Sequence, residues 1–353
     1  MLIARAPVRV SLAGGGTDLP VYYERHGGFV VSTTIDKYFY VFINLNSPES
    51  VQVSSSDYRI FYRHQAGQQP LWDGDLGLVK AALHDFGIEG GMSLFLASEV
   101  PPGTGLGTSS TVAVALVKAL ATLRGLSLTA AEVADRACAL ELEKLRSPIG
   151  KQDQHAAAFG GLNAISFSRE QITVEPLSVA SETRERLQRN LLLFFTGSTR
   201  SANAVLSSQQ RASGEEGSDT VRALHGIKAA ASEARRCLES GALSDFGEIL
   251  AESWELKKRL APGVTNSRID ELYELARRHG AVGGKLAGAG GGGFLMLYCE
   301  ESCQAAVSHA LEGAGLYRMD YRFEQGGAQV LMNALPRTAW RWAARNGQEA
   351  GYA

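Results

Sequence analysis

The chain has 353 residues, of which 45% are hydrophobic and 20% charged, a composition typical of a globular protein long enough to form two lobes. A formal net charge of -2 argues against nucleic-acid binding, and no apolar run approaches the ~20 residues of a membrane span. The four cysteines lack the spacing of a zinc site and the N-terminal strand contains arginines, so we expect reduced thiols, no signal peptide and a cytoplasmic protein.

The first half of the chain is rich in predicted strands. Strands are expected over residues 2–12, 28–46, 51–63 and 92–100, and the second of these is dense in β-branched and aromatic residues. Helices are expected over residues 76–86, 109–124 and 129–145. Thr129 and Glu132 open the last helix with the pattern of a capping box.

The second half of the chain is richer in predicted helices. These cover residues 221–240, 244–259, 267–279 and 303–314, and strands are expected over 159–167, 191–195, 294–299 and 328–332. The polar tract 209–220 is expected to be a loop. The sequence therefore predicts an α+β protein with two lobes, residues 1–180 and 181–353, whose boundary lies near 170–190.

The most informative segment is P-P-G-T-G-L-G-T-S-S at residues 101–110, which leads directly into an apolar helix. Glycines allow a ligand to approach the backbone closely. The first N–H groups of a helix lack intrahelical partners, and the helix dipole favours negative charge there. The segment is therefore a candidate phosphate cradle. The hydroxyls of Thr108, Ser109 and Ser110 can cap the helix, contact a phosphate or bind a metal ion.

Two further glycine clusters, at residues 14–16 and 288–293, accompany an acidic segment, G-K-Q-D-Q, at 150–154. Phosphoryl transfer requires such parts: a backbone cradle for phosphates, oxygen ligands for Mg²⁺, and a base beside the acceptor hydroxyl. No lysine follows Gly107 as in a P-loop, and no H-R-D segment precedes the D-F-G at residues 85–87. A dinucleotide-binding Rossmann motif would have an acidic residue at a suitable spacing after its βα turn, and this chain has none there.

The motifs A-P-V-R-V-S-L-A-G-G-G-T-D-L-P (6–20), residues 101–110 and K-L-A-G-A-G-G-G-G-F (285–294) resemble, in order and spacing, those of the GHMP small-molecule kinases. The resemblance implies the GHMP kinase fold, with an active-site cleft between two lobes. Together with G-K-Q-D-Q and T-G-S-T-R-S (196–201), these motifs are similar to those of bacterial D-glycero-D-manno-heptose 7-phosphate kinases. The implied reaction is ATP-dependent phosphorylation of the anomeric hydroxyl to the 1,7-bisphosphate, on the route to GDP-heptose and surface polysaccharide.

Alternatives to that function are a fucokinase-like or other hexose kinase, and a non-catalytic sensor that binds sugar and nucleotide. The resemblance makes Asp153 the general base and Arg9 the group that orients it, whereas each could instead be an ordinary capping or surface residue. The implied ATP-binding residues are Pro102, Gly103, Thr104, Gly105, Gly107, Thr108, Ser109 and Ser110. The implied sugar-binding residues are Gly15, Gly16, Thr17, Asp18, Asp153, Ser198, Arg200, Gly290 and Gly291.

Magnesium is expected on Ser109 and one glutamate of E-L-E-K, and the resemblance favours Glu143, with Glu141 as the alternative. Ser198 and Arg200 are candidates for holding the distal phosphate of a sugar phosphate. Lys285 either contacts phosphate or caps a strand. The expected partners are thus ATP and a small sugar phosphate, with neither nucleic acid nor membrane, and a homodimer is compatible with the sequence.

Overall fold

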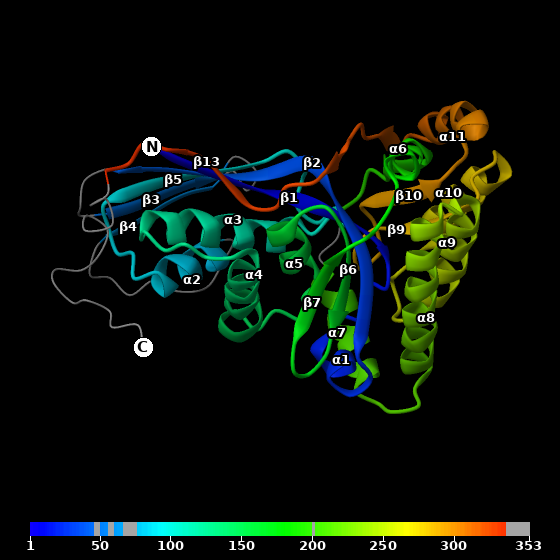
Figure 1. Cartoon of the computed structure of the whole chain (residues 1–353), viewed down its shortest axis with the longest axis horizontal. Helices are drawn as coiled ribbons and strands as arrows, with labels where there is room; N and C mark the ends of the chain where they lie inside the picture. The colour runs from blue at the N-terminus through cyan, green and yellow to red at the C-terminus, as the bar shows by residue number, and fades with distance from the viewer. Residues whose placement is uncertain (46–49, 56–59, 66–75, 200–201, 337–353) are drawn as a thin grey trace.

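The computed structural model describes residues 1–45, 50–55, 60–65, 76–199 and 202–336. Figure 1 shows a strand-rich lobe from the first half of the chain beside a helix-rich lobe from the second half. The predicted α+β class is confirmed.

Within the described residues, nine strands form the first sheet, in the order β13-β1-β2-β5-β3-β4, while β12 and β6 also pair with β2, and β7 pairs with β6. These strands are β1 (Leu2–Ala13), β2 (Gly28–Leu45), β3 (Ser50–Ser55), β4 (Ile60–Gln65), β5 (Met92–Ser98), β6 (Leu162–Phe167), β7 (Ile172–Pro176), β12 (Phe323–Glu324) and β13 (Gln329–Asn333).

The helices of the first half are α1 (Pro20–His26), α2 (Gly77–Asp85), α3 (Thr108–Leu123), α4 (Ala130–Cys138), the π-helix η1 (Ala139–Lys144) and α5 (Gln152–Phe159). Helices α2 to α4 lie beneath the long strands in Figure 1. Alternate residues of β2, Phe39, Val41 and Ile43, point toward α3 and are buried with it in one hydrophobic core. This packing fixes α3, and therefore its N-terminus, against the centre of the sheet.

Four strands form the second sheet, in the order β11-β8-β10-β9, within the described part of the chain: β8 (Leu191–Phe195), β9 (Gly283–Leu286), β10 (Phe294–Tyr298) and β11 (Tyr317–Arg318). The helices of this half are α6 (Ser181–Asn190), α7 (Ala202–Ser213), α8 (Asp219–Ser240), α9 (Leu243–Lys258), α10 (Ser267–Arg278) and α11 (Glu301–Gly313). Met296 and Tyr298 of β10 pack with α8 and α9, whereas Leu295 and Leu297 pack with α10 and α11. Both faces of the second sheet are therefore covered.

Strand β1 belongs to both lobes. Val8, Val10 and Leu12 are buried in a core that also contains residues of β8, β10, α8 and α9. Because side chains alternate along a strand, Arg9 and Ser11 point to the other side, where they line a cleft. The pairing of β1 with β2 shifts register between Pro7 and Arg9.

Most predicted elements are present, with some corrections. The tract 209–220 is a loop only in its middle, because residues 209–213 complete α7 and residues 219–220 begin α8. The helix predicted over 129–145 changes to a π-helix at Ala139, and α1, α5 and α6 were missed. The lobe boundary near 170–190 stays a prediction, although β12 and β13 return from the end of the second half to the first sheet.

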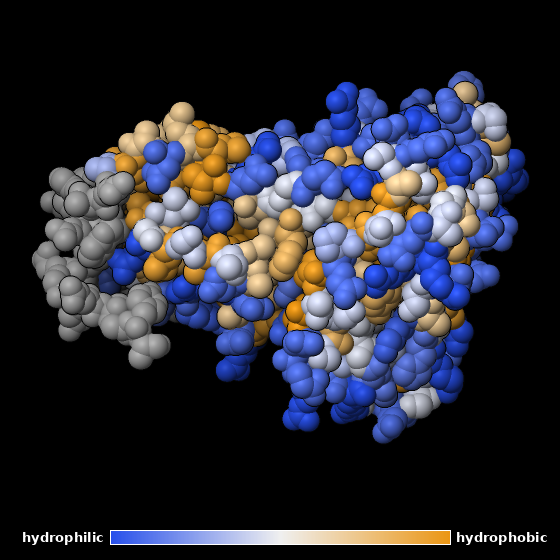
Figure 2. All heavy atoms as spheres, in the orientation of Figure 1, coloured by the Kyte–Doolittle hydropathy of each residue, from blue (hydrophilic) through white to orange (hydrophobic). Residues whose placement is uncertain are grey.

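The four cysteines are free thiols, as predicted. None of the helices in the described ranges is both long and apolar enough to cross a membrane. Figure 2 shows apolar residues gathered at the upper left, over part of the first sheet. On the outer side of that sheet, the rings of Tyr40, Phe42 and Phe95 form a row, and Phe95 is exposed. The homodimer stays a prediction.

Candidate active site

The glycine loop before α3 forms one wall of the cleft. Gly103, Gly105 and Gly107 have φ angles of 76°, 84° and 74°, a region that favours glycine. Gly107 is the N-cap of α3, and no side chain caps the helix there. The serine hydroxyls instead join other groups, because Ser109 donates to Glu141 and Ser110 accepts from Gln154. The first turn of α3 is therefore available to an anion in the cleft.

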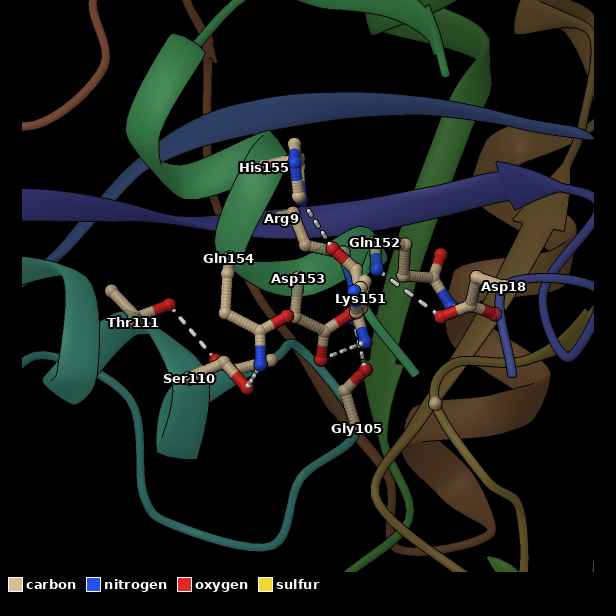
Figure 3. A network of polar contacts seen from close by, with 12 residues as sticks. Arg9, Asp18, Gly105, Ser110, Thr111, Lys151, Gln152, Asp153, Gln154 and His155 are labelled. Atoms are coloured by element: carbon tan, nitrogen blue, oxygen red, sulfur yellow. Dashed lines mark hydrogen bonds and ion pairs between the residues drawn. The ribbon is translucent and has the colours of Figure 1, made fainter. Parts of the chain in front are cut away.

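Arg9 and Asp153 form a bidentate ion pair at the centre of the site (Figure 3). Arg9 Nε lies 2.7 Å from Asp153 Oδ1 and Nη2 lies 2.8 Å from Oδ2, while Nη1 donates to the Gly105 carbonyl at 2.6 Å. Arg9 is buried and comes from β1, whereas Asp153 lies in the first turn of α5. A Cβ at Gly107 would lie 3.0 Å from Asp153 Oδ2, so this glycine gives the carboxylate room beside the loop.

Asp18 closes the other side of the cleft. Its Oδ1 accepts hydrogen bonds from Gly16 N and the Gln152 side chain, and its Oδ2 accepts from Gln152 N. Burial raises the pKa of Asp18, and the negative charge of Asp153 raises it further. A Cβ at Gly150 would lie 1.8 Å from Asp18 Oδ2, so the close approach of the 150–154 segment to Asp18 requires glycine.

Glu141 is the glutamate of E-L-E-K that enters the site. It is buried in η1, its Oε1 lies 3.4 Å from Ser109 Oγ, and its Oε2 accepts from Gln154 Nε2 at 2.6 Å. Burial raises the pKa of Glu141 to about 7, although hydrogen bonds from Ser110, Gln154 and Ser109 oppose the shift. Glu143 is exposed and outside the cleft lining, so the structure favours the alternative, Glu141, over Glu143. The two side chains lie on different faces of the helix, because residues two positions apart do not share a face.

Two lysines from the second half of the chain also line the cleft, Lys257 on α9 and Lys285 on β9. Burial lowers the pKa of Lys285 to about 7, with a further lowering by the charge of Arg9. Burial, followed by the charges of Lys285 and Arg9, also lowers the pKa of Lys257 well below its ordinary value. The cleft thus combines three basic side chains with the carboxyl groups of Asp18, Glu141 and Asp153.

The sequence matches models for both domains of one family. Residues 76–161 match the GHMP kinases N terminal domain, and residues 234–315 match GHMP kinases C terminal. The D-glycero-alpha-D-manno-heptose 7-phosphate kinase of Campylobacter jejuni is 31% identical over 331 residues, which cover 92% of this chain and 97% of that protein. The chain belongs to the GHMP kinase family. It is a sugar kinase, as the motifs predicted, and GHMP kinases are ATP-dependent phosphotransferases.

Two further relatives support the assignment to this family of sugar kinases. The crystal structure of a D-glycero-D-manno-heptose 1-phosphate kinase from Bacteroides thetaiotaomicron superposes with a TM-score of 0.79 at 28% identity, covering 95% of this chain and 100% of that one. The L-fucokinase/L-fucose-1-P guanylyltransferase of Bacteroides fragilis is 27% identical over 336 residues, which cover 86% of this chain and 35% of that longer protein.

The GHMP kinase cleft contains many of the sequence-predicted site residues. These are Arg9, Gly15, Gly16, Asp18, Gly103, Gly105, Gly107, Thr108, Ser109, Ser110, Glu141 and Asp153. Thr17 and Thr104 are buried outside this lining, where their hydroxyls bind backbone carbonyls of the loops that contain them. Pro102 is also outside the lining.

The third glycine cluster lines the cleft through residues two positions earlier in the chain than the predicted ones. Gly288 and Ala289 line it, whereas Gly290 and Gly291 pack against Val264, whose carbonyl accepts a hydrogen bond from Gly291 N. Gly290 and Gly291, which the resemblance implied as sugar-binding residues, therefore contact the backbone of Val264 and are outside the cleft lining.

Ser198, the other candidate for the distal phosphate, is exposed and outside the cleft lining. Arg200 lies outside the described residues.

Lys257 is one of the cleft residues that the sequence did not predict. It is the first of two adjacent lysines at the end of α9, and adjacent positions on a helix face different directions. The available signal was the K-K pair itself, which does not reveal which lysine points inward. The contacts of Lys257 lie about thirty residues further along the chain, at Leu286 and Gly288.

Proposed function

We propose that this GHMP kinase transfers phosphate from ATP to the anomeric hydroxyl of D-glycero-D-manno-heptose 7-phosphate and forms the 1,7-bisphosphate. The observation that carries the chemistry is the Arg9–Asp153 ion pair, which faces the same cleft as Asp18 and the uncapped N-terminus of α3. The full-length similarity to the Campylobacter jejuni heptose 7-phosphate kinase supports the sugar. The product would serve the synthesis of GDP-heptose and surface polysaccharide.

Asp153 is the general base in this proposal. Each of its carboxylate oxygens accepts one hydrogen bond from Arg9, which fixes the orientation of the carboxylate and leaves further lone pairs for a hydroxyl proton. The positive charge of Arg9 also stabilises negative charge that develops on the acceptor oxygen. Asp18 is suited to bind sugar hydroxyls, because it lines the cleft and its carboxyl oxygens can accept hydrogen bonds from hydroxyl groups.

The first turn of α3 would bind the phosphates of ATP, and Ser109 with Glu141 would hold Mg²⁺. Mg²⁺ prefers hard oxygen ligands and retains several waters, so one hydroxyl and one carboxylate form a suitable protein contribution. The proximity of Ser109 Oγ to Glu141 Oε1 supports this pair. When bound, the ion supplies charge stabilisation to the phosphates.

Substitution Asp153→Asn tests the base. We expect kcat to fall by about 10²- to 10⁴-fold, because the amide cannot accept the hydroxyl proton. A coupled ADP-release assay with ATP and Mg²⁺ should compare heptose 7-phosphate, mannose and fucose. Asp135→Asn is a matched control, because the Asp135 side chain is 72% exposed and outside the cleft. Retention of wild-type kcat by Asp153→Asn would exclude Asp153 as the base.

A fucokinase-like activity is the second candidate, supported by the similarity to the Bacteroides fragilis enzyme. Turnover of fucose without turnover of heptose 7-phosphate would establish it and refute the proposed sugar. Absence of turnover with all three sugars, despite measurable nucleotide binding, would favour a sugar and nucleotide sensor. The cytoplasmic location stays a prediction.

A further inference from the structure

Lys257 and Lys285 reach the cleft from two different elements of the helix-rich lobe. Lys285 lies on β9, directly before the third glycine loop, and Lys257 lies near the end of α9. Both line the cleft together with Arg9 and Gly105 of the other lobe. Neither lysine is used by the Asp153 chemistry described above.

Lys257 is bound to the backbone of the glycine loop. Its ammonium donates to the carbonyls of Leu286 and Gly288, each at 2.6 Å. These carbonyls flank Ala287. Ala287 also contacts the glycine loop before α3, because a Cβ on Gly105 would lie 2.4 Å from the Ala287 carbonyl oxygen. Lys257 therefore holds the start of the third glycine loop against the cradle that precedes α3.

Lys285 has no such partner. Its side chain is buried, with 5% relative exposure, and no hydrogen bond or ion pair joins it to another described residue. The charged group that acts on the Lys285 ammonium is Arg9, which is also a cation. Buried polar groups normally have hydrogen-bond partners, and burying an unpaired cation is unfavourable. The position of Lys285 in the cleft lining therefore indicates a partner that arrives with a ligand.

The acidic groups of the cleft already have partners. Asp153 is bound by Arg9 through both oxygens, Asp18 by Gly16 and Gln152, and Glu141 by Gln154 and Ser109. An anionic ligand is therefore the group that matches Lys285. Phosphate oxygens suit a lysine ammonium because it is a compact positive charge with three donors.

The arrangement of the loops favours the nucleotide as the source of that phosphate. Gly288, three residues after Lys285, packs against Gly105 of the cradle, and Gly105 accepts a hydrogen bond from Arg9. We propose that Lys285 binds the terminal phosphate of the nucleotide, and that Lys257 is a positioning residue which fixes the third glycine loop beneath it. This inference rests on the proposed phosphoryl transfer and adds a residue that distinguishes ATP from ADP.

Substitution Lys285→Met tests the contact, because methionine keeps much of the side-chain length without the charge. Isothermal titration should measure a non-hydrolysable ATP analogue, ADP and heptose 7-phosphate separately against wild type and variant. We expect the analogue to bind about 10- to 100-fold more weakly, the range of a lost charged hydrogen bond, and ADP to change by less than about 3-fold. Lys258→Met is the control, because Lys258 pairs with Glu255 and lies outside the cleft lining.

Equal affinities of wild type and Lys285→Met for the ATP analogue would overturn the inference. Weaker binding of heptose 7-phosphate with unchanged nucleotide binding would also overturn it, because the phosphate partner would then be the sugar's. Failure of wild type to bind any nucleotide would instead refute the proposed function.

Lys257→Met tests the positioning role separately. The substitution should lower the affinity for the ATP analogue even at temperatures where the variant is fully folded. A merely structural lysine would lower Tm without changing the affinity of the folded protein, and that result would remove Lys257 from the proposal.

Discussion

The charged side chains of the cleft differ in how completely other protein groups bind them. Asp153 and Arg9 satisfy one another, whereas Glu141 and Lys285 are buried with pKa values shifted to about 7 from opposite directions. Both shifts arise mainly from burial, which disfavours the charged form of an acid and of a base alike. The free protein therefore keeps the Arg9–Asp153 ion pair formed, while burial disfavours the charged forms of Glu141 and Lys285.

Lys285 gives the stability of the free protein a pH dependence that can be measured. Its pKa is about 7 in the folded state against an ordinary 10.5, so folding releases a proton between these values. The contribution of Lys285 to the free energy of unfolding is then greatest above pH 10.5 and falls as the pH decreases to about 7. The slope is at most about 1.4 kcal/mol per pH unit for one proton.

Lys285→Met should remove this dependence, so its Tm advantage over wild type should be largest near pH 7 and shrink as the pH rises. Thermal unfolding of both proteins at a series of pH values from 7 upward measures this difference in Tm. Parallel Tm curves would show that the amine is not destabilised by burial.

At the scale of elements, local signals predicted helices and strands better than they predicted their irregularities. The capping box of Thr129 and Glu132 is present as predicted, with both reciprocal hydrogen bonds formed. The change from α4 to the π-helix η1 has no residue signature. The preference for Glu143 over Glu141 came from the family resemblance alone, because the sequence does not show which of the two side chains is buried. Helix α5 was missed because it is short and mostly buried, which leaves little amphipathic periodicity.

The glycine motifs predicted which loop and which carboxyl group, Asp18, line the cleft, because these residues belong to the motifs themselves. Lys257 could not be found in this way, because its partners are carbonyls of another element. The orientation of a lysine at the end of a helix depends on tertiary packing that the local sequence does not encode.

Thr129→Ala tests the contribution of the cap to α4. We expect the free energy of unfolding to fall by about 1 kcal/mol, because the Glu132 N–H loses its acceptor and the reciprocal bond loses its geometry. Urea denaturation measures the change, and kcat should stay at the wild-type value because Thr129 is exposed and outside the cleft. An unchanged denaturation midpoint would mean that the cap does not stabilise the protein.

At the scale of the whole molecule, the last described strands join the helix-rich lobe to the first sheet. Strand β12 pairs with β2, and β13 pairs with β1. Glu324 of β12 reinforces this return, because its carboxylate accepts hydrogen bonds from the Tyr38 hydroxyl and from Gly326 N. The two halves of the sequence therefore do not correspond simply to two separate lobes.

Tyr38→Phe tests that connection. Loss of the phenol donor to the Glu324 carboxylate should lower the free energy of unfolding by about 1.5–3 kcal/mol, the range for hydrogen bonds to charged groups. Tyr40→Phe, on the same strand and more exposed, is the matched control. Differential scanning calorimetry of both variants measures the effect, and an equal Tm decrease in the two would contradict a specific role for the Tyr38–Glu324 bond.

The return of β13 to β1 has a consequence for biosynthesis. Strand β1 is translated long before β13, the strand that flanks it in the finished protein, and the Met1 carbonyl accepts a hydrogen bond from Ala334 N. This edge of β1 thus stays unpaired until residues 329–333 have been translated. During that interval the nascent chain carries an open strand edge of the kind that other chains can pair with.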